Sequence, residues 1–204
     1  MNSNGPPHVA QHVVCAVRGG PESRETVSQA INLALSNGAR LTFFRVTDAE
    51  FLEHATIGPL SVVYQELREL ANNFKVVAIG EIGLDFYRNH SPREKQRQVF
   101  GKQIELARSL ALPMVIHIRD AYDEALDMLA AEQAWEHGAV LHCFSGNRDQ
   151  AFRALDLGFM LSFGGVLTFK NSRLPELVKQ VPLESLLVET DSPYLAPVPY
   201  RGKS

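Results

Sequence analysis

The chain has 204 residues, of which 45% are hydrophobic and 21% are charged, values close to those of an average globular protein. This length can supply one sizeable core or two small ones, and it lies near the lower limit of roughly 200 residues for an eight-unit βα barrel. The formal net charge of −3 leaves no general basic field and argues against sequence-specific binding of duplex nucleic acid.

The cysteines and the N-terminal residues predict a soluble cytoplasmic protein without a disulfide framework. The two cysteines, Cys15 and Cys143, each lie in an apolar run, where buried free thiols are the usual outcome. Residues 1–11 are polar and lack the basic and apolar segments of a secretory signal, so they predict a disordered leader. No apolar stretch reaches the roughly 18 residues of a membrane span.

Residues 12–80 predict alternating strands and helices. Short apolar runs indicate the strands, and apolar residues at helical spacing indicate the helices. Asn37-Gly38 ends the first helix with a residue that tolerates positive φ. The strands are predicted over 12–17, 41–46 and 76–79, and the helices over 22–36 and 60–71.

The same alternation continues to the end of the chain. Strands are predicted over 114–118, 139–144, 159–163 and 186–189, and helices over 92–110, 122–132, 148–157 and 174–179. Helix-covered strands of this kind form parallel sheets, so we expect one α/β domain over 12–204 with a TIM-barrel-like arrangement. Seven predicted strands are one short of a closed barrel, which predicts a partial or hybrid barrel whose edges a homodimer would cover.

Metal-binding side chains stand at the ends of four predicted strands. Glu81 follows 76–79, His117 ends 114–116, His142 ends 139–141 and Asp191 follows 186–189. The carboxyl ends of parallel strands meet at one edge of the sheet, where such side chains can share a site. Two imidazoles and two carboxylates suit Zn²⁺, Mn²⁺ or Mg²⁺, metals that activate water for phosphoester hydrolysis.

Each of these residues also has a simpler explanation. A histidine at a strand end can be a satisfied polar residue, Glu81 can be a turn carboxylate, and Asp191 before Ser192-Pro193 can be a helix N-cap. Their equivalent positions at four strand ends favour a shared site over four separate explanations.

Five segments resemble the successive signatures of the TatD-type metal-dependent deoxyribonucleases, over about residues 67–204. They are 80–87 (GEIGLDFY), 115–121 (VIHIRDA), 142–146 (HCFSG), 162–165 with 168–171 (SFGG, TFKN) and 189–197 (ETDSPYLAP).

The resemblance implies a (β/α)8 barrel with a two-metal centre that hydrolyses DNA phosphodiesters. Glu81 would bridge the metals, His117 and His142 would bind one of them, and Asp191 would bind the other and help activate the attacking water. Candidate contacts to substrate phosphate are Arg119, Arg201 and Lys203.

The sequence departs from the family pattern at its N-terminal side. The family's first strand carries a His-x-His pair, which this sequence lacks, and His8 and His12 lie on the wrong side of the first strand to replace it. The family's last helix is also missing. We therefore expect one tight metal site rather than two, and weakened nuclease activity, since a two-metal centre stabilises both the attacking and the leaving oxygen.

Residues of about 10–70 are similar instead to the first half of a universal stress protein, a flavodoxin-like βαβα segment. The resemblance rests on 12–23 (HVVCAVRGGPES) and 39–46 (ARLTFFRV), and the change to the nuclease-like part falls near 66–70. The sequence thus resembles a chimera, either engineered or naturally rearranged. Two alternatives to the hydrolase stay open: an inactive α/β scaffold and a nucleotide-binding module of the stress-protein class.

Overall fold

The computed structural model describes residues 12–17, 40–45, 68, 71, 76–191 and 195–202. The chain divides into two compact units, residues 1–80 and 81–204. The predicted leader, the predicted helix over 22–36 and the join near 66–70 lie outside the described residues, except that Arg68 is described. Of the predicted helix over 60–71, Arg68 and Ala71 are described, and both are helical.

The N-terminal unit contains two parallel strands, β1 (His12–Val17) and β2 (Arg40–Arg45). Their register runs from His12 opposite Arg40 to Val17 opposite Arg45. The first strand has the predicted bounds, and the second begins and ends one residue earlier than predicted. A parallel pair is what the predicted βα alternation requires.

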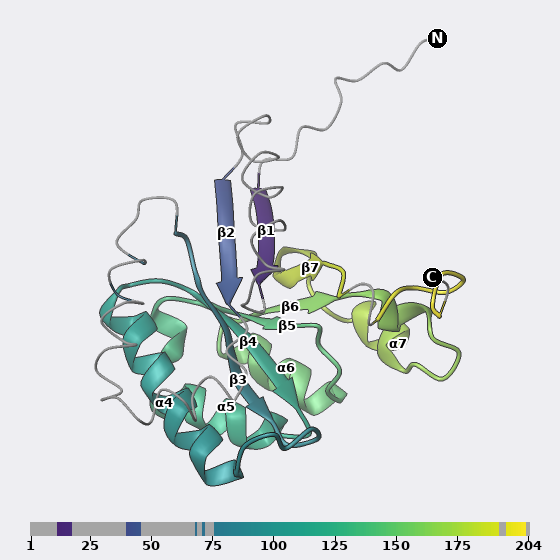
Figure 1. Ribbon diagram of the computed structural model, residues 1–204. Coiled ribbons are helices and arrows are strands. Elements are labelled where there is room, and N and C mark those ends of the chain that lie inside the picture. The colour runs from purple at the N-terminus through teal and green to yellow at the C-terminus, as the bar shows by residue number, and fades with distance from the viewer. Residues whose placement is uncertain are drawn as a thin grey trace. The chain divides into compact units, whose positions relative to one another are not determined.

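The C-terminal part is built on a five-stranded sheet whose strand order follows the chain, β3-β4-β5-β6-β7 (Figure 1). The pairs β4–β5, β5–β6 and β6–β7 are parallel. The strands are β3 (Ile79–Asp85), β4 (Met114–Arg119), β5 (Ala139–His142), β6 (Met160–Phe163) and β7 (Leu186–Val188).

Helices connect these strands and gather on one side of the sheet (Figure 1). They are α4 (Arg93–Ser109), α5 (Tyr122–Ala131), α6 (Arg148–Asp156) and α7 (Leu174–Val178). Each lies within about two residues of its predicted bounds. Helix α6 begins with a capping box, because the Asn147 side chain accepts from the Gln150 N–H while the Gln150 side chain accepts from the Asn147 N–H.

The two faces of the sheet differ in burial, as the two-residue alternation of a strand predicts. Ile82 and Leu84 in β3, and Met114, Ile116 and Ile118 in β4, are buried. The alternate residues of the same strands, among them Glu81, Asp85, His117 and Arg119, are only half-buried. The first set packs in the apolar core with helix residues such as Phe100, Ile104 and Leu126, and the second set makes up the polar face.

The short 3₁₀ helices η1 (Ala134–Glu136), η2 (Gly165–Thr168) and η3 (Leu183–Ser185) were not predicted. The larger difference concerns β3, which was predicted over 76–79 and instead runs over 79–85. The glycines at 80 and 83 indicate a turn in the sequence, but Gly83 lies inside the strand with a φ of 145°. Glu81 therefore lies within a strand rather than after one.

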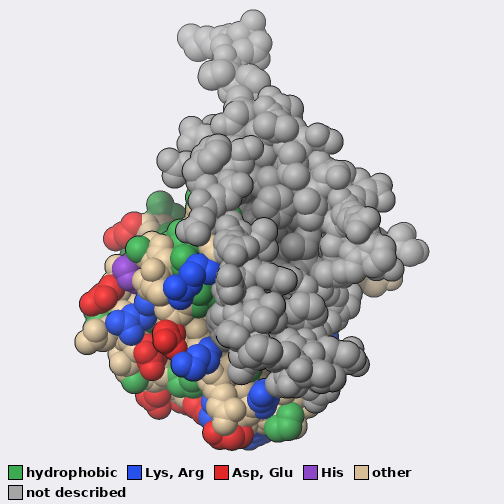
Figure 2. Space-filling view, turned by 60° about the vertical axis from the view of Figure 1, so that its left-hand side comes forward, with side chains coloured by type: hydrophobic (Ala, Val, Ile, Leu, Met, Phe, Trp, Pro, Cys, Tyr) green, Lys and Arg blue, Asp and Glu red, His purple; other side chains and the backbone are tan. Residues whose placement is uncertain are grey.

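Basic and acidic side chains are interspersed on the face of the described residues that Figure 2 shows. This distribution agrees with the absence of a general basic field in the composition. Within the described part of the chain, no helix combines the length and the apolar character that crossing a membrane requires.

Candidate metal centre

Three of the four candidate ligands lie on the polar face of the sheet. Glu81 lies in β3, His117 in β4 and His142 at the end of β5. His117 and His142 are register partners in the parallel β4–β5 pair, so strand geometry places the two imidazoles side by side. The sequence prediction that these strand ends meet is consistent with this register.

The Glu81 carboxylate contacts both imidazoles through one oxygen. Its Oε1 lies 2.9 Å from His117 Nδ1 and 3.5 Å from His142 Nε2. Burial opposes ionisation of Glu81, but the hydrogen bond with His117 and the positive charges of His117 and His142 outweigh it, so the pKa of Glu81 lies below its ordinary value. The site therefore holds a negative charge between two histidines.

Asp85 is a second carboxylate at the same imidazole, and the sequence analysis did not assign it a role. Its Oδ2 lies 3.2 Å from His117 Nε2, while its Oδ1 accepts the backbone N–H groups of Tyr87 at 3.1 Å and Arg88 at 2.8 Å. Although burial opposes ionisation of Asp85, its hydrogen bonds with His117 and the Arg88 N–H, and the charges of His117 and Arg119, lower its pKa to about 2. Asp85 lies four residues after Glu81, and strand alternation could have placed it on the same face.

The two carboxylates act together on His117. Burial favours the neutral imidazole, but the hydrogen bonds with Asp85 and Glu81 and the charges of both carboxylates raise the pKa of His117 to about 9. Both ring nitrogens of His117 are thereby fixed in direction, as ring nitrogens are when one binds a metal and the other binds an orienting carboxylate.

Glu189 orients the second imidazole. Its carboxylate pairs with His142 Nδ1 and also accepts the Cys143 N–H and the Ser162 hydroxyl. Burial opposes its ionisation, but the hydrogen bond with His142 and the charge of His142 dominate and lower the pKa of Glu189. The sequence analysis placed this residue at a strand end and at the start of the segment 189–197 but gave it no role, and its contacts depend on the pairing of β6 with β7.

Asp191, the fourth candidate ligand, follows β7 and is half-buried. Its backbone carbonyl accepts the N–H of Leu195 at 3.4 Å. Its charge, with that of Glu81 and Glu189, acts to raise the pKa of His142 against the effect of burial. Asp191 is therefore close enough to act electrostatically on His142, although no described hydrogen bond or ion pair joins its carboxylate to Glu81 or either histidine.

The family comparison agrees with this arrangement of residues. The model of TatD related DNases matches residues 46–204. The chain belongs to this family. The match begins before residue 67, where the nuclease resemblance was expected to start, so it includes residues 46–66. Residues 46–66 therefore match the nuclease family and not the expected stress-protein segment of about 10–70, and no relative or similar structure supports that segment or a chimera with a join near 66–70.

Curated relatives support the same assignment. The chain is 46% identical over 138 residues to YabD of Bacillus subtilis (strain 168), an uncharacterized metal-dependent hydrolase, covering 67% of this chain and 54% of that protein. It is 43% identical over 137 residues to a 3'-5' ssDNA/RNA exonuclease TatD of Klebsiella pneumoniae (strain 342), covering 66% and 52%. The chain thus spans about half the length of the curated relatives it matches.

The crystal structure of YJJV, a TatD homologue of Escherichia coli K12, is similar with a TM-score of 0.75 and 28% identity, covering 94% of this chain and 71% of that one. The TatD structural neighbours are TIM-barrel-like, and the predicted α/β fold with parallel, TIM-barrel-like βα repeats is confirmed.

Two of the three candidate phosphate contacts of this TatD chain are described, and both are stacked on aromatic rings. The Arg119 guanidinium carbon lies 3.9 Å from the centroid of the Tyr87 ring, and that of Arg201 lies 3.9 Å from the centroid of the Phe169 ring. Arg119 is on the polar face, two residues beyond His117. Arg201 has no described contact with the candidate ligands, and Lys203 lies outside the described residues.

The chemistry of the donor set fits a divalent metal. Imidazole nitrogens and carboxylate oxygens are ligands that Zn²⁺, Mn²⁺ and Mg²⁺ accept, and two of the donors face one oxygen of Glu81. In the structure these side chains contact one another. Among the described residues, no group of three or more His, Cys, Asp or Glu side chains is arranged so that it could hold a metal ion as it stands. Metal binding would therefore replace contacts between Glu81 and the histidines.

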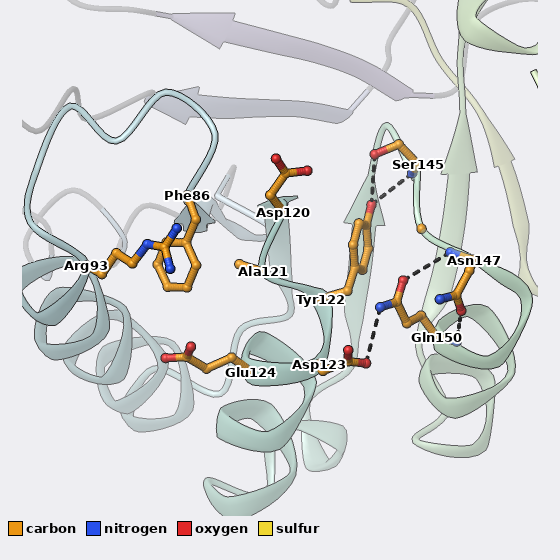
Figure 3. A pocket seen from close by; sticks show the side chains of 11 residues that line it. Phe86, Arg93, Asp120, Ala121, Tyr122, Asp123, Glu124, Ser145, Asn147 and Gln150 are labelled. Carbon is orange, nitrogen blue, oxygen red and sulfur yellow. Dashed lines mark hydrogen bonds between the residues drawn. The ribbon is translucent and has the colours of Figure 1, made fainter.

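A cavity of about 470 Å³ opens around the loops that follow β3, β4 and β5, and none of the four candidate ligands lines it (Figure 3). Arg93 and Phe86 line one side of it, and Asn147 and Gln150 line the other. The Tyr122 hydroxyl accepts the Ser145 N–H at 2.8 Å and so ties the loop after β5 to the start of α5. The cavity therefore has walls held by hydrogen bonds at the carboxyl edge of the sheet.

Proposed function

We propose that this protein is a metal-dependent phosphodiester hydrolase of the TatD type, acting on nucleic acid at the centre formed by Glu81, His117 and His142. The observation that carries the proposal is the contact of one Glu81 oxygen with both imidazoles, on the polar face of the sheet. The names of the relatives, metal-dependent hydrolase and ssDNA/RNA exonuclease, support this class of reaction.

Glu81, His117 and His142 would hold a divalent metal, Zn²⁺, Mn²⁺ or Mg²⁺. When bound, such a metal lowers the pKa of water and neutralises charge on phosphoryl oxygens. Asp85 and Glu189 would hold the imidazoles in the orientation that binding requires, as outer carboxylates do in metal sites.

Asp191 would serve as the group that takes a proton from the attacking water. It is half-buried, it follows the last strand of the sheet, and its charge acts on His142. A carboxylate with solvent access beside the ligands can accept a proton and release it to bulk water. Glu81, the other candidate catalytic group, would help fix the position from which that water attacks the phosphorus.

Arg119 would hold a phosphate of the substrate, because its guanidinium lies on the same face as the candidate ligands. Arg201 and Lys203 are further candidates for this role. We further propose that one metal is held tightly and that hydrolysis is slow, since the described donors around Glu81 account for a single site.

Two other hypotheses follow from the sequence: an inactive chimeric scaffold and a nucleotide-binding module. Among the described residues we find no contact that favours either. A metal-dependent reaction would argue against the first, and protection from thermal unfolding by ATP would support the second.

Calorimetric titration with Zn²⁺ and Mn²⁺ tests the proposed centre directly. The unchanged protein should bind one equivalent, and Glu81→Gln should abolish the heat because it removes the charge at the shared oxygen. Glu176→Gln is the matched control, since Glu176 pairs only with Lys179 on the exposed side of α7 among the described residues. Equal heats for the unchanged protein and Glu81→Gln would contradict the proposed centre.

Hydrolysis is tested with a 3′-labelled single-stranded oligonucleotide and added Mn²⁺. Cleavage should depend on the metal and should be lost in Asp191→Asn and Glu81→Gln, with Glu176→Gln unaffected. Cleavage that persists in both variants of the centre would mean that the activity belongs to another site or to a contaminant.

A further inference from the structure

An exposed aromatic ring stands next to the candidate metal centre. Tyr87 lies two residues after the end of β3 and is 63% exposed. Arg119, the last residue of β4, lies over this ring with its guanidinium carbon 3.9 Å from the ring centroid. The ring is thus in contact with a cation and still largely open to solvent.

The position of Tyr87 is fixed relative to the candidate ligands. The Asp85 carboxylate accepts the Tyr87 N–H with one oxygen and contacts His117 with the other. The Phe86 N–H donates to the Arg119 carbonyl at 2.9 Å, which joins the ends of β3 and β4. The Tyr87–Arg119 pair is therefore held by the same carboxylate that orients a candidate metal ligand.

The neighbouring aromatic residue shows how a structural ring differs. Phe86 is buried, with the guanidinium carbons of Arg93 and Arg97 at 4.7 and 5.5 Å from its ring centroid. Tyr87 is covered by one guanidinium, that of Arg119, but it stays 63% exposed and contributes little to the core. An exposed aromatic ring beside polar groups has a face on which a ligand can stack.

We infer that Tyr87, with Arg119 over its ring, is a stacking platform for an unpaired nucleobase of single-stranded nucleic acid. This inference takes its ligand from the proposed function. An aromatic ring stacks on any base, and an arginine supplies charge for the adjoining phosphate. In a duplex the bases already stack on one another, so the platform favours unpaired strands. Stacking on a base does not distinguish DNA from RNA, which differ in the sugar.

The test compares two labelled oligonucleotides with the same phosphate backbone, an oligothymidylate and a version with abasic residues. Binding is measured by fluorescence anisotropy of the full chain without added divalent metal, and kcat and KM are measured with Mn²⁺. The unchanged protein should bind the base-bearing strand about 5- to 150-fold more tightly, the range expected for one stacked base. The comparison on the unchanged protein needs no variant and so does not depend on folding of a mutant.

Variants locate the effect at the ring. Tyr87→Ala should bind both strands with the affinity of the abasic strand, and its KM for the base-bearing strand should rise with kcat little changed. Tyr87→Phe keeps the ring and should keep the preference. Trp135→Ala is the matched control, since Trp135 is 44% exposed and lies just before β5, at the amino ends of the strands and not at their carboxyl ends.

Equal affinity of the unchanged protein for the two strands, or no binding of either, would overturn the inference. So would a preference that survives in Tyr87→Ala. If base-dependent binding holds but no hydrolysis occurs, the proposed function fails while the platform stands. If hydrolysis occurs with the same ratio in the unchanged protein and in Tyr87→Ala, the function stands and the platform fails.

Discussion

Gly83 lies so close to His117 that a Cβ on residue 83 would be 1.9 Å from the His117 carbonyl oxygen. The backbone of β3 thus passes against the backbone of β4 at the residue that carries a candidate ligand. The φ of Gly83, 145°, is also one that L-residues rarely adopt. This glycine sets how closely the Glu81 and His117 side chains can approach each other.

Gly83→Ala should therefore destabilise the protein and weaken metal binding. We expect a loss of about 2–4 kcal/mol, in the range of substitutions that force a backbone to move in a packed region. Thermal melts give the stability, and calorimetry with Zn²⁺ gives the affinity. Gly101→Ala in α4 is the control, because among the described residues a Cβ there would meet only Met128 Cε of α5, at 3.9 Å. That change should stabilise the helix by about 0.5–1 kcal/mol, and equal melting temperatures for the two variants would contradict the close-approach argument.

Most of what positions the site follows from strand alternation. The predicted strand over 114–118 and helix over 92–110 agree with β4 and α4 to within a residue or two, and alternation puts His117 and Arg119 on one face. Glu81 joins them because β3 continues through Gly83. In the sequence, Gly80 and Gly83 indicate a turn. The close contact of Gly83 with β4 becomes visible only when the neighbouring strand is in place.

The contacts within the site could not be predicted in the same way. Asp85 lies in the segment 80–87 that resembles a family signature, but the way its two oxygens are shared between His117 and the Tyr87 N–H depends on how the chain turns after β3. Glu189 reaches Ser162 and Cys143 only because β6 pairs with β7 in a particular register. Periodicity assigns a face to each residue, whereas partners across strands depend on register and on loop geometry.

Asp85→Asn should lower the affinity for metal about 10- to 100-fold, the usual effect of removing a carboxylate that orients a histidine ligand. It should also lower the pKa of His117, because it removes one of the two charges that raise it. The affinity is measured by calorimetry and the imidazole pKa by NMR titration. Asp127→Asn is the control, since Asp127 pairs with Arg153 on the surface. Unchanged affinity in Asp85→Asn would show that Asp85 does not act through His117.

Glu189→Gln should disturb His142 in the same way, while leaving His117 unchanged. The amide keeps the size of the side chain and can keep an oxygen for the Cys143 N–H and the Ser162 hydroxyl, but it removes the charge that pairs with His142. The pKa of His142 should fall toward its ordinary value, as followed by NMR titration. A shift confined to His117 would contradict the assignment of Glu189 to His142.

The stability of the protein without added metal should depend on pH through His117 and Asp85. The pKa of His117 is raised from 6.5 to about 9, so its stabilising contribution is complete below pH 6.5 and is lost as the pH rises through 9. The pKa of Asp85 is lowered from 3.8 to about 2, so its contribution is present above pH 3.8 and is lost as the pH falls through 2. Both contributions are complete only between about pH 4 and 6.5.

Thermal melts across this range, in the presence of a chelator, give the measurement. The melting temperature should fall between pH 6.5 and 9. His117→Gln should remove most of this fall, whereas the control His137→Gln, outside the centre, should show the same fall as the unchanged protein. The affinity for metal should instead rise between pH 6.5 and 9, because a metal binds the neutral imidazole and has to displace the proton from the charged one. A metal affinity that does not change between pH 6.5 and 9 would mean that His117 is not a ligand.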